Sequence, residues 1–140
     1  MELIMSAYVG CETEINDIEV LLESLVEMGI QREKIEVHEV AQKLHGYQGD
    51  AREQKAHVVV RRRAVGAASN DIGFERMEDG RYKTWVSEYD SLRGLGKQIA
   101  AGRLLATYAK NRVLKEAAKR RVKSVTCKEE NGRMRIRIRI

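Results

Sequence analysis

The chain has 140 residues, of which 43% are hydrophobic and 34% charged, and it has a formal net charge of +5. This length predicts one domain over residues 1–140, large enough to bury a core without metal or disulfide staples, and the apolar periodicity excludes a disordered chain. No stretch approaches the roughly 18 apolar residues of a membrane span, and no basic leader precedes the first strand, so we expect a cytoplasmic protein with no membrane partner.

Acidic residues dominate the first part of the sequence and basic residues dominate the last part. Residues 1–90 carry 11 Lys/Arg and 18 Asp/Glu, a balance of −7, whereas residues 91–140 carry 15 and 3, a balance of +12. Such asymmetry is typical of a polyanion site, of an acidic part matched to a basic part within one molecule, or of head-to-tail self-association. These three alternatives stay open at the level of the sequence.

The chain begins with a predicted strand and a predicted helix. Apolar and polar residues alternate over residues 5–13, which indicates a half-buried strand. Asn16 and Glu19 have the spacing of a capping box, and apolar residues then recur at helical spacing until Gly29, a typical residue after a helix end. We therefore expect a helix that Asn16 caps and Gly29 ends.

Two further strands are predicted over residues 35–40 and 56–65. The second begins with apolar residues and reaches solvent at its end as Arg61–Arg63. Residues 44–55 between them are polar and predict a loop.

Two glycines give this loop a special conformation. Gly46 and Gly49 flank Tyr47, and Arg52 and Lys55 follow closely. The backbone amides of such a loop can form a nest for an anion, but a rigid structural turn explains the same pattern.

A hairpin is predicted over residues 70–90, around the Asp-Gly dipeptide at residues 79–80. If these are the two loop residues of a type I′ turn, Phe74 lies opposite Trp85, which would pair the only Phe with the only Trp. The same register places Gly73 opposite Val86, where a missing side chain allows close approach to the backbone.

A long helix is predicted over residues 95–121. Its inner face includes Gly102, which indicates close packing against the sheet. The opposite face is basic: Arg103, Lys110, Arg112, Lys115 and Lys119.

The chain closes with a second hairpin around Asn131-Gly132. A type I′ turn at this dipeptide pairs Cys127 with Ile136 and Thr126 with Arg137, which gives one apolar and one polar face. The polar face carries a row of arginines about 6.6–6.8 Å apart, twice the rise per residue of a strand. They are Arg133, Arg135, Arg137 and Arg139.

Together the elements predict an α+β fold in the order β-α-β-β-β-β-α-β-β. We expect an antiparallel, or mixed, sheet of about six or seven strands with both helices on one face. The opening strand-helix-strand unit leaves room for a parallel pair. Cys11 and Cys127 show no paired spacing for a metal, and their neighbours indicate strand interiors, so we expect reduced thiols in the core.

Several motifs occur together in this chain: Met5-Ser6, the segment 56–60, the segment 108–119 and the closing Asn131-Gly132 hairpin. The most specific residues among them are Gly46, Tyr47, Gly49, Asp71, Gly73 and Phe74. In this combination they resemble the domain of unknown function 1257 family, of the hypothetical chloroplast reading frame thirty-five type. Lys110 and Asn111 replace a Tyr-His pair that relatives tend to have, and Arg121 replaces a glycine. The resemblance implies identity and fold, and no activity.

No catalytic or metal-binding motif stands out. His38, His45 and His57 with nearby Glu36 and Glu39 match no compact metal-ligand spacing, so we expect no metal and no cofactor. Asp71 is the polar residue best suited to a special task, but the turn preference of Asp favours the simpler explanation, that its carboxylate bonds turn amides.

Two functions therefore compete. The first is a non-catalytic accessory protein that binds RNA, DNA or another polyanion through an arginine-rich sheet face. The alternative is a protein-interaction adaptor or a homo-oligomeric subunit, and a minor third is an enzyme around Asp71 and the Gly46 loop. The residues predicted to bind a polyanion are Arg61, Arg63, Arg133, Arg135, Arg137 and Arg139.

Overall fold

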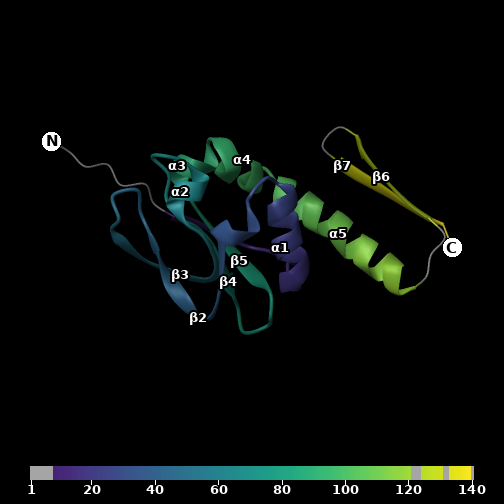
Figure 1. Ribbon diagram of the computed structural model, residues 1–140, viewed down its shortest axis with the longest axis horizontal. Coiled ribbons are helices and arrows are strands. Elements are labelled where there is room, and N and C mark those ends of the chain that lie inside the picture. The colour runs from purple at the N-terminus through teal and green to yellow at the C-terminus, as the bar shows by residue number, and fades with distance from the viewer. Residues whose placement is uncertain (1–7, 121–123, 131–132, 140) are drawn as a thin grey trace.

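The computed structural model describes residues 8–120, 124–130 and 133–139 and has the predicted α+β class (Figure 1). The strands are β1 Tyr8–Glu12, β2 Ile35–His45, β3 Ala51–Val60, β4 Ile72–Arg76, β5 Tyr82–Ser87, β6 Ser124–Glu130 and β7 Arg133–Arg139. The α-helices are α1 Ile18–Glu27, α2 Arg62–Val65, α3 Glu88–Ser91, α4 Gly94–Ala100 and α5 Arg103–Lys119, and Arg32–Lys34 form a 3-10 turn. No helix in these described ranges is long and apolar enough to cross a membrane.

The strands form two sheets where the sequence predicted one. Five strands make a sheet in the order β1-β5-β4-β3-β2, and β6 and β7 form a separate two-stranded ribbon. All pairings among the described strands are antiparallel. The parallel pair expected from the opening strand-helix-strand unit is absent from them, because α1 carries the chain from one edge of the sheet to the other.

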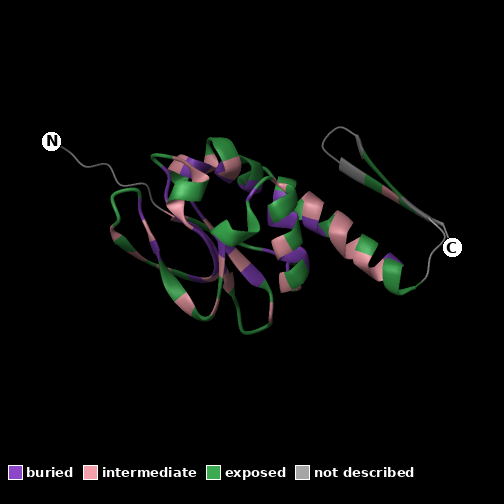
Figure 2. Ribbon diagram, in the orientation of Figure 1, coloured by how far each residue is buried: buried purple, intermediate pink, exposed green. Residues whose placement is uncertain are grey.

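The main core lies between one face of the five-stranded sheet and the helices (Figure 2). Val58 and Phe74 of the sheet are fully buried with Leu21 of α1, and Tyr108 of α5 completes this layer. Each large apolar side chain buried in this way stabilises the fold by about 1.5–3 kcal/mol. A smaller cluster around Leu44 covers the opposite face.

The first helix begins one residue later than the capping-box pattern indicates. Asp17, and not Asn16, is the N-cap, and its Oδ1 accepts a hydrogen bond from the N–H of Val20 at 3.3 Å. The N–H groups of Asn16 and Asp17 donate to the hydroxyl of Tyr108 at 3.1 and 3.0 Å. A contact from α5 therefore fixes this helix start. Gly29 follows the helix end with φ of 104°, as predicted.

The predicted loop over residues 44–55 is mostly strand. β2 runs on to His45 and β3 begins at Ala51, which leaves only residues 46–50 as the turn. The residues there are polar because this hairpin extends into solvent, so composition alone indicated a loop. β3 ends at Val60, and the arginines expected at its end begin α2 instead.

The central hairpin is displaced by one residue from the predicted register. Phe74 pairs with Thr84, and Gly73 pairs with Trp85. The N–H of Met77 donates to the carbonyl of Arg81 at 2.8 Å, and Gly80 between them has φ of 87°. These are the features of a three-residue loop with a glycine bulge, for which an Asp-Gly dipeptide is equally suited.

The displacement separates the two aromatic side chains, because a slip of one residue moves a side chain to the other face of a sheet. Phe74 is fully buried beneath the helices. Trp85 lies on the opposite face beside Leu44, where its Nε1 donates to Glu75 at 3.1 Å. The predicted aromatic pair does not form.

The long C-terminal helix is interrupted. α4 ends at Ala100 and α5 begins at Arg103, because Gly102 has a left-handed φ of 89°. A Cβ built on Gly102 would meet no atom within 4 Å. Gly102 therefore turns the backbone between two helices and does not allow close packing as predicted. The predicted helix end at Arg121 lies outside the described residues.

The closing ribbon has the predicted register. Cys127 pairs with Ile136 and Thr126 with Arg137, while the Asn131-Gly132 turn itself lies outside the described residues. The ribbon packs against α5 and adds no strand to the main sheet (Figure 1). Both Cys127 and Cys11 are exposed, so the prediction of buried thiols is wrong.

The pairing of Gly73 allows a first test of the packing. A Cβ at this position would lie 2.6 Å from the Cβ of Ala56 and 2.8 Å from Leu44. We expect Gly73→Ala to lower the free energy of unfolding by about 1–3 kcal/mol, the usual cost of overpacking, as measured by urea denaturation. Gly80→Asn is the control, because Asn tolerates a left-handed φ. Equal losses in the two variants would contradict this packing.

Candidate functional site

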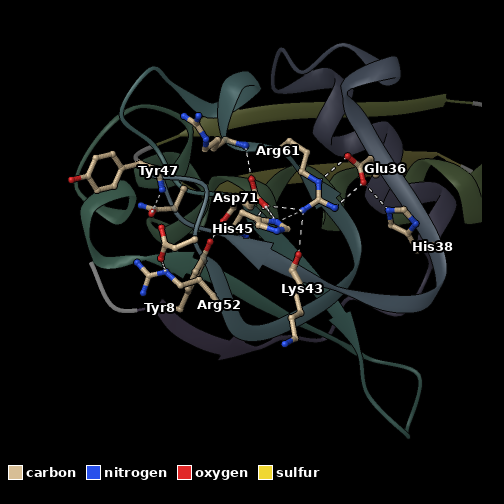
Figure 3. Close-up of polar contacts among 12 residues, drawn as sticks. Tyr8, Glu36, His38, Lys43, His45, Tyr47, Arg52, Arg61 and Asp71 are labelled. Carbon is tan, nitrogen blue, oxygen red and sulfur yellow. Dashed lines mark hydrogen bonds and ion pairs between the residues drawn. The ribbon is translucent and has the colours of Figure 1, made fainter. Parts of the chain in front are cut away.

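The polar centre of the molecule is the side chain of Asp71, which is only 1% exposed (Figure 3). Its Oδ2 accepts hydrogen bonds from the N–H of His45 at 2.7 Å and from Nη1 of Arg61 at 2.8 Å. Its Oδ1 accepts from the N–H of Arg62 at 2.7 Å, and its backbone carbonyl accepts from the hydroxyl of Tyr8 at 2.6 Å. Asp71 thus joins β1, the end of β2 and the start of α2.

Arg61 carries the network outward to Glu36 on β2. Its Nε and Nη2 bond to the two carboxylate oxygens of Glu36 at 2.9 and 3.1 Å, while Nη1 reaches Asp71. Nε2 of His38 lies 2.8 Å from Oε1 of Glu36. The hydrogen bond from Arg61 holds the pKa of Glu36 below its usual value, and Glu36 raises the pKa of Arg61. The guanidinium is thus engaged by two carboxylates.

Burial keeps the hydroxyl of Tyr8 protonated. Desolvation, followed by the charge of Asp71, raises the pKa of the Tyr8 hydroxyl far above its ordinary value. The hydroxyl therefore stays protonated and donates to the Asp71 carbonyl.

A second buried cluster adjoins Asp71. The N–H of Asn70 donates to Oδ2 of Asp90 at 2.9 Å, and its Nδ2 donates to the hydroxyl of Ser87 at 2.9 Å. Ser87 caps α3 by accepting from the N–H of Asp90 at 3.1 Å, and its hydroxyl lies 2.7 Å from Oδ2 of that residue. The cluster ties the segment before β4 to the turn of helix after β5. Oδ1 of Asp90 is buried without a hydrogen-bond partner.

The glycine-rich turn joins both clusters. The N–H of Tyr47 donates to Oδ1 of Asn70 at 3.0 Å, the N–H of Gly46 to the carbonyl of Asp50 at 2.9 Å, and the N–H of Gly49 to the carbonyl of Gly46 at 2.9 Å. Because these amides already donate within the protein, the turn has the geometry of a structural element and not that of an anion nest.

Sequence reasoning singled out Asp71 but missed most of its surroundings. The additional members are Tyr8, Glu36, Asn70, Ser87 and Asp90. Asn70 directly precedes Asp71, and Ser87 with Asp90 has the spacing of a helix cap, so a local signal existed for these three. Tyr8 and Glu36 gave none, because only the tertiary fold brings them to the site.

The histidines do not assemble a metal site. His38 and His45 face the Arg61 network, whereas Nδ1 of His57 accepts a hydrogen bond from the N–H of Arg76 at 3.0 Å. Burial lowers the pKa of His57. Within the described residues, no three His, Cys, Asp or Glu side chains gather closely enough to hold a metal ion.

The basic face of α5 is matched by the acidic face of α1. Lys110 pairs with Glu27. Arg112 and Lys115 both pair with Asp17, at 3.0 and 2.8 Å. Burial acts to raise the pKa of Asp17, but the hydrogen bonds from Lys115 and from the helix amide outweigh it and lower that pKa. Much of the predicted basic helix surface is thus compensated within the molecule.

The six predicted polyanion-binding arginines separate into three groups. Arg61 is engaged in the Asp71 network, and Arg63 is exposed on α2. Arg135 and Arg137 are exposed on β7. The side chains of Arg133 and Arg139 lie outside the described residues. The buried Gly73 and Phe74 of the family motif belong to the core.

Comparison with known proteins gives a family and no further relatives. A family profile, described as a protein of unknown function (DUF1257), matches residues 25–137. The matched range includes Asp71, Arg61 and Glu36 and the residues Gly46 to Phe74 that are most specific to the resemblance, whereas Tyr8 and Met5-Ser6 precede it. No curated protein and no solved structure gives a significant match.

The burial of Asp71 leads to a prediction for stability. Asp71→Asn removes the charge facing Arg61 and replaces an acceptor with a donor, so we expect a loss of about 3 kcal/mol or more in the free energy of unfolding. Glu36→Gln should cost less, because Glu36 is 37% exposed and its pair with Arg61 is screened by water. Urea denaturation of both variants measures this, and equal losses would show that Asp71 is not the centre of the network.

The lowered pKa of Glu36 predicts a pH dependence. A carboxylate whose pKa is lower in the folded state contributes stability above its ordinary pKa of 4.5, and that contribution is lost as the pH falls through the folded value. Glu36→Gln should therefore flatten the fall in melting temperature below about pH 4.5. The exposed Glu39→Gln on the same strand is the control, and identical profiles for the two variants would contradict the effect.

Proposed function

The chain belongs to the DUF1257 family of proteins of unknown function, and we propose that it is a non-catalytic accessory protein that binds RNA, DNA or another polyanion. The proposed binding surface is the arginine face of the ribbon β6–β7. The proposal includes a cytoplasmic location, which is supported by two exposed free cysteines, since a reducing compartment keeps thiols unpaired.

Ion pairs within the molecule argue against α5 and Arg61 as the binding surface. Lys110, Arg112 and Lys115 of α5 pair with carboxylates of α1. Arg61 pairs with two carboxylates, so the proposed surface does not include it. The ribbon itself, residues 124–139, carries five Lys/Arg and two Asp/Glu, a balance of +3. A net positive charge therefore lies on the part of the chain that forms the ribbon.

The observation that carries the proposal is the register of β7. Because alternate residues of a strand share one face, Arg135 and Arg137 lie on the same side of the ribbon, together with the positions of Arg133 and Arg139. Arg135 and Arg137 are exposed. A planar guanidinium bonds to phosphate oxygens through two donors, which suits a row of arginines to a phosphate backbone.

The composition of the ribbon indicates how it would bind. Residues 124–139 contain no Phe, Tyr or Trp, so no aromatic side chain is present on which a base could stack. Phosphate contacts alone give affinity without sequence preference and with a strong dependence on salt. We therefore propose binding to the backbone of a nucleic acid and not to its bases.

The alternative is an interaction protein, an adaptor or a homo-oligomeric subunit. It is supported by apolar side chains at the edge of the sheet, where Val9 is 51% exposed. An enzyme around Asp71 has less support, because both carboxylate oxygens of Asp71 already accept hydrogen bonds from the protein.

The proposal is tested with Arg135→Glu/Arg137→Glu. We expect this variant to bind a mixed-sequence RNA or DNA more weakly than the wild-type protein by at least about tenfold at 50 mM salt in mobility-shift titrations. Lys34→Glu/Lys55→Glu changes the net charge equally at exposed positions elsewhere and should lose much less affinity. Absence of retardation by the wild-type protein, or an equal loss in both variants, would contradict the proposal.

A further inference from the structure

An apolar cavity of about 220 Å³ opens beside strand β1. It lies between the β1–β5 edge of the sheet and the junction of α4 with α5, where the chain turns at Gly102. Its principal apolar lining residues are Val9, Val86, Ile99, Leu104 and Leu105. A cavity of this size is large enough to hold one large apolar side chain.

The mouth of the cavity exposes apolar surface. Val9 is 51% exposed and Leu105 is 41% exposed, and Cys11, which also lines the cavity, is exposed as well. An apolar cavity whose rim is also apolar favours an occupant over water.

Strand β1 presents an edge to the same place. It pairs only with β5, so in the described part of the chain its outer backbone groups have no neighbouring strand. Tyr8–Glu12 contains no Lys and no Pro, the residues that commonly protect an edge from strand addition. An open edge beside a pocket for alternate side chains is the arrangement by which proteins bind an added strand.

The ribbon β6–β7 has the properties of such an added strand. A two-stranded ribbon is only marginally stable by itself. Among the larger contacts between described elements, this ribbon contacts only α5. Its apolar face is incompletely covered, because Ile136 is half-buried and Cys127, directly opposite, is exposed. Its outer edges have no partner strand within the described part of the chain.

The two parts of the chain that would meet in this contact have net charges of opposite sign. The part of the chain that contains β1 has a balance of −7, and the part that contains the ribbon has a balance of +12. The three cations of α5 that pair with α1 reduce this difference without removing it. A basic ribbon is therefore attracted to the sheet of a second copy.

We propose that the edge of β1 and its cavity bind the ribbon β6–β7 of a second copy of this chain, with an apolar side chain of the ribbon in the cavity. By strand alternation, Ile136 then faces the helices, and Arg135 and Arg137 lie on the opposite sheet face with Glu12 of β1. Because two different surfaces meet, the contact is head to tail and forms rings or chains. The arginine face stays accessible, so this contact does not depend on the proposed polyanion binding.

Sedimentation velocity of the full-length protein over a concentration series tests the proposal. We expect reversible self-association, and we expect Val9→Lys to weaken it at least about tenfold, since a charge at the cavity mouth repels the ribbon. Val40→Lys is the matched control, because Val40 is 74% exposed on β2 at the opposite edge of the sheet. A monomer at every concentration, or equal weakening by both substitutions, overturns the proposal.

A mixing experiment identifies the occupant. Val9→Lys leaves the ribbon intact, and Ile136→Glu leaves the β1 edge intact, so each variant alone should be monomeric while an equimolar mixture forms a 1:1 complex. Circular dichroism confirms that both variants are folded. Failure of the mixture to form a complex, or self-association of Ile136→Glu alone at the wild-type level, overturns the ribbon as occupant. Polyanion binding by Val9→Lys is measured separately, so that failure of the self-association proposal can be distinguished from failure of the polyanion proposal.

Discussion

The structure depends on the burial of one carboxylate. Removal of Asp71 from water is costly unless its charge and lone pairs are satisfied. Donors from Arg61, Arg62 and His45 satisfy them, and they come from two segments, the start of α2 and the end of β2. Once these bonds form, the end of β2, the start of α2 and the start of β4 have fixed relative positions. The network also explains why the glycine-rich turn lies against Asn70, next to Asp71.

The same principle of charge compensation shapes the surfaces of α1 and α5. The acidic face of α1 and the basic face of α5 neutralise each other, as Arg112 and Asp17 illustrate at 3.0 Å. Arg61 is likewise engaged by Glu36 and Asp71. The net charge of +5 therefore does not by itself indicate a general affinity for anions, because Arg61 and several cations of α5 already have acidic partners.

Short sequence patterns predicted the structural features that depend on neighbouring residues, such as turns and strand register. The register of the ribbon could be derived because Asn-Gly favours a two-residue turn. Asp79-Gly80 suits both a two-residue and a three-residue loop. The three-residue loop shifts the register by one residue, which places Trp85 on the other face of the sheet. The α+β class followed from the order of elements. Asp71 was recognisable as a special residue, but its bonds to His45 and Tyr8 cross 26 and 63 residues of sequence. No local pattern specifies partners at that distance.

The two edges of the sheet differ in how they resist strand addition. β2 carries Glu36, His38 and Lys43, and its pairing with β3 is interrupted between Val37 and Gln42. Charged side chains and irregular pairing both protect an edge, because they twist it away from a neighbouring strand and make its burial costly. β1 pairs with β5 without interruption, and Glu12 at its end is its only charged residue. Since only one edge accepts a strand, assembly through the ribbon would proceed in one direction, and each copy would contribute one ribbon and one acceptor edge.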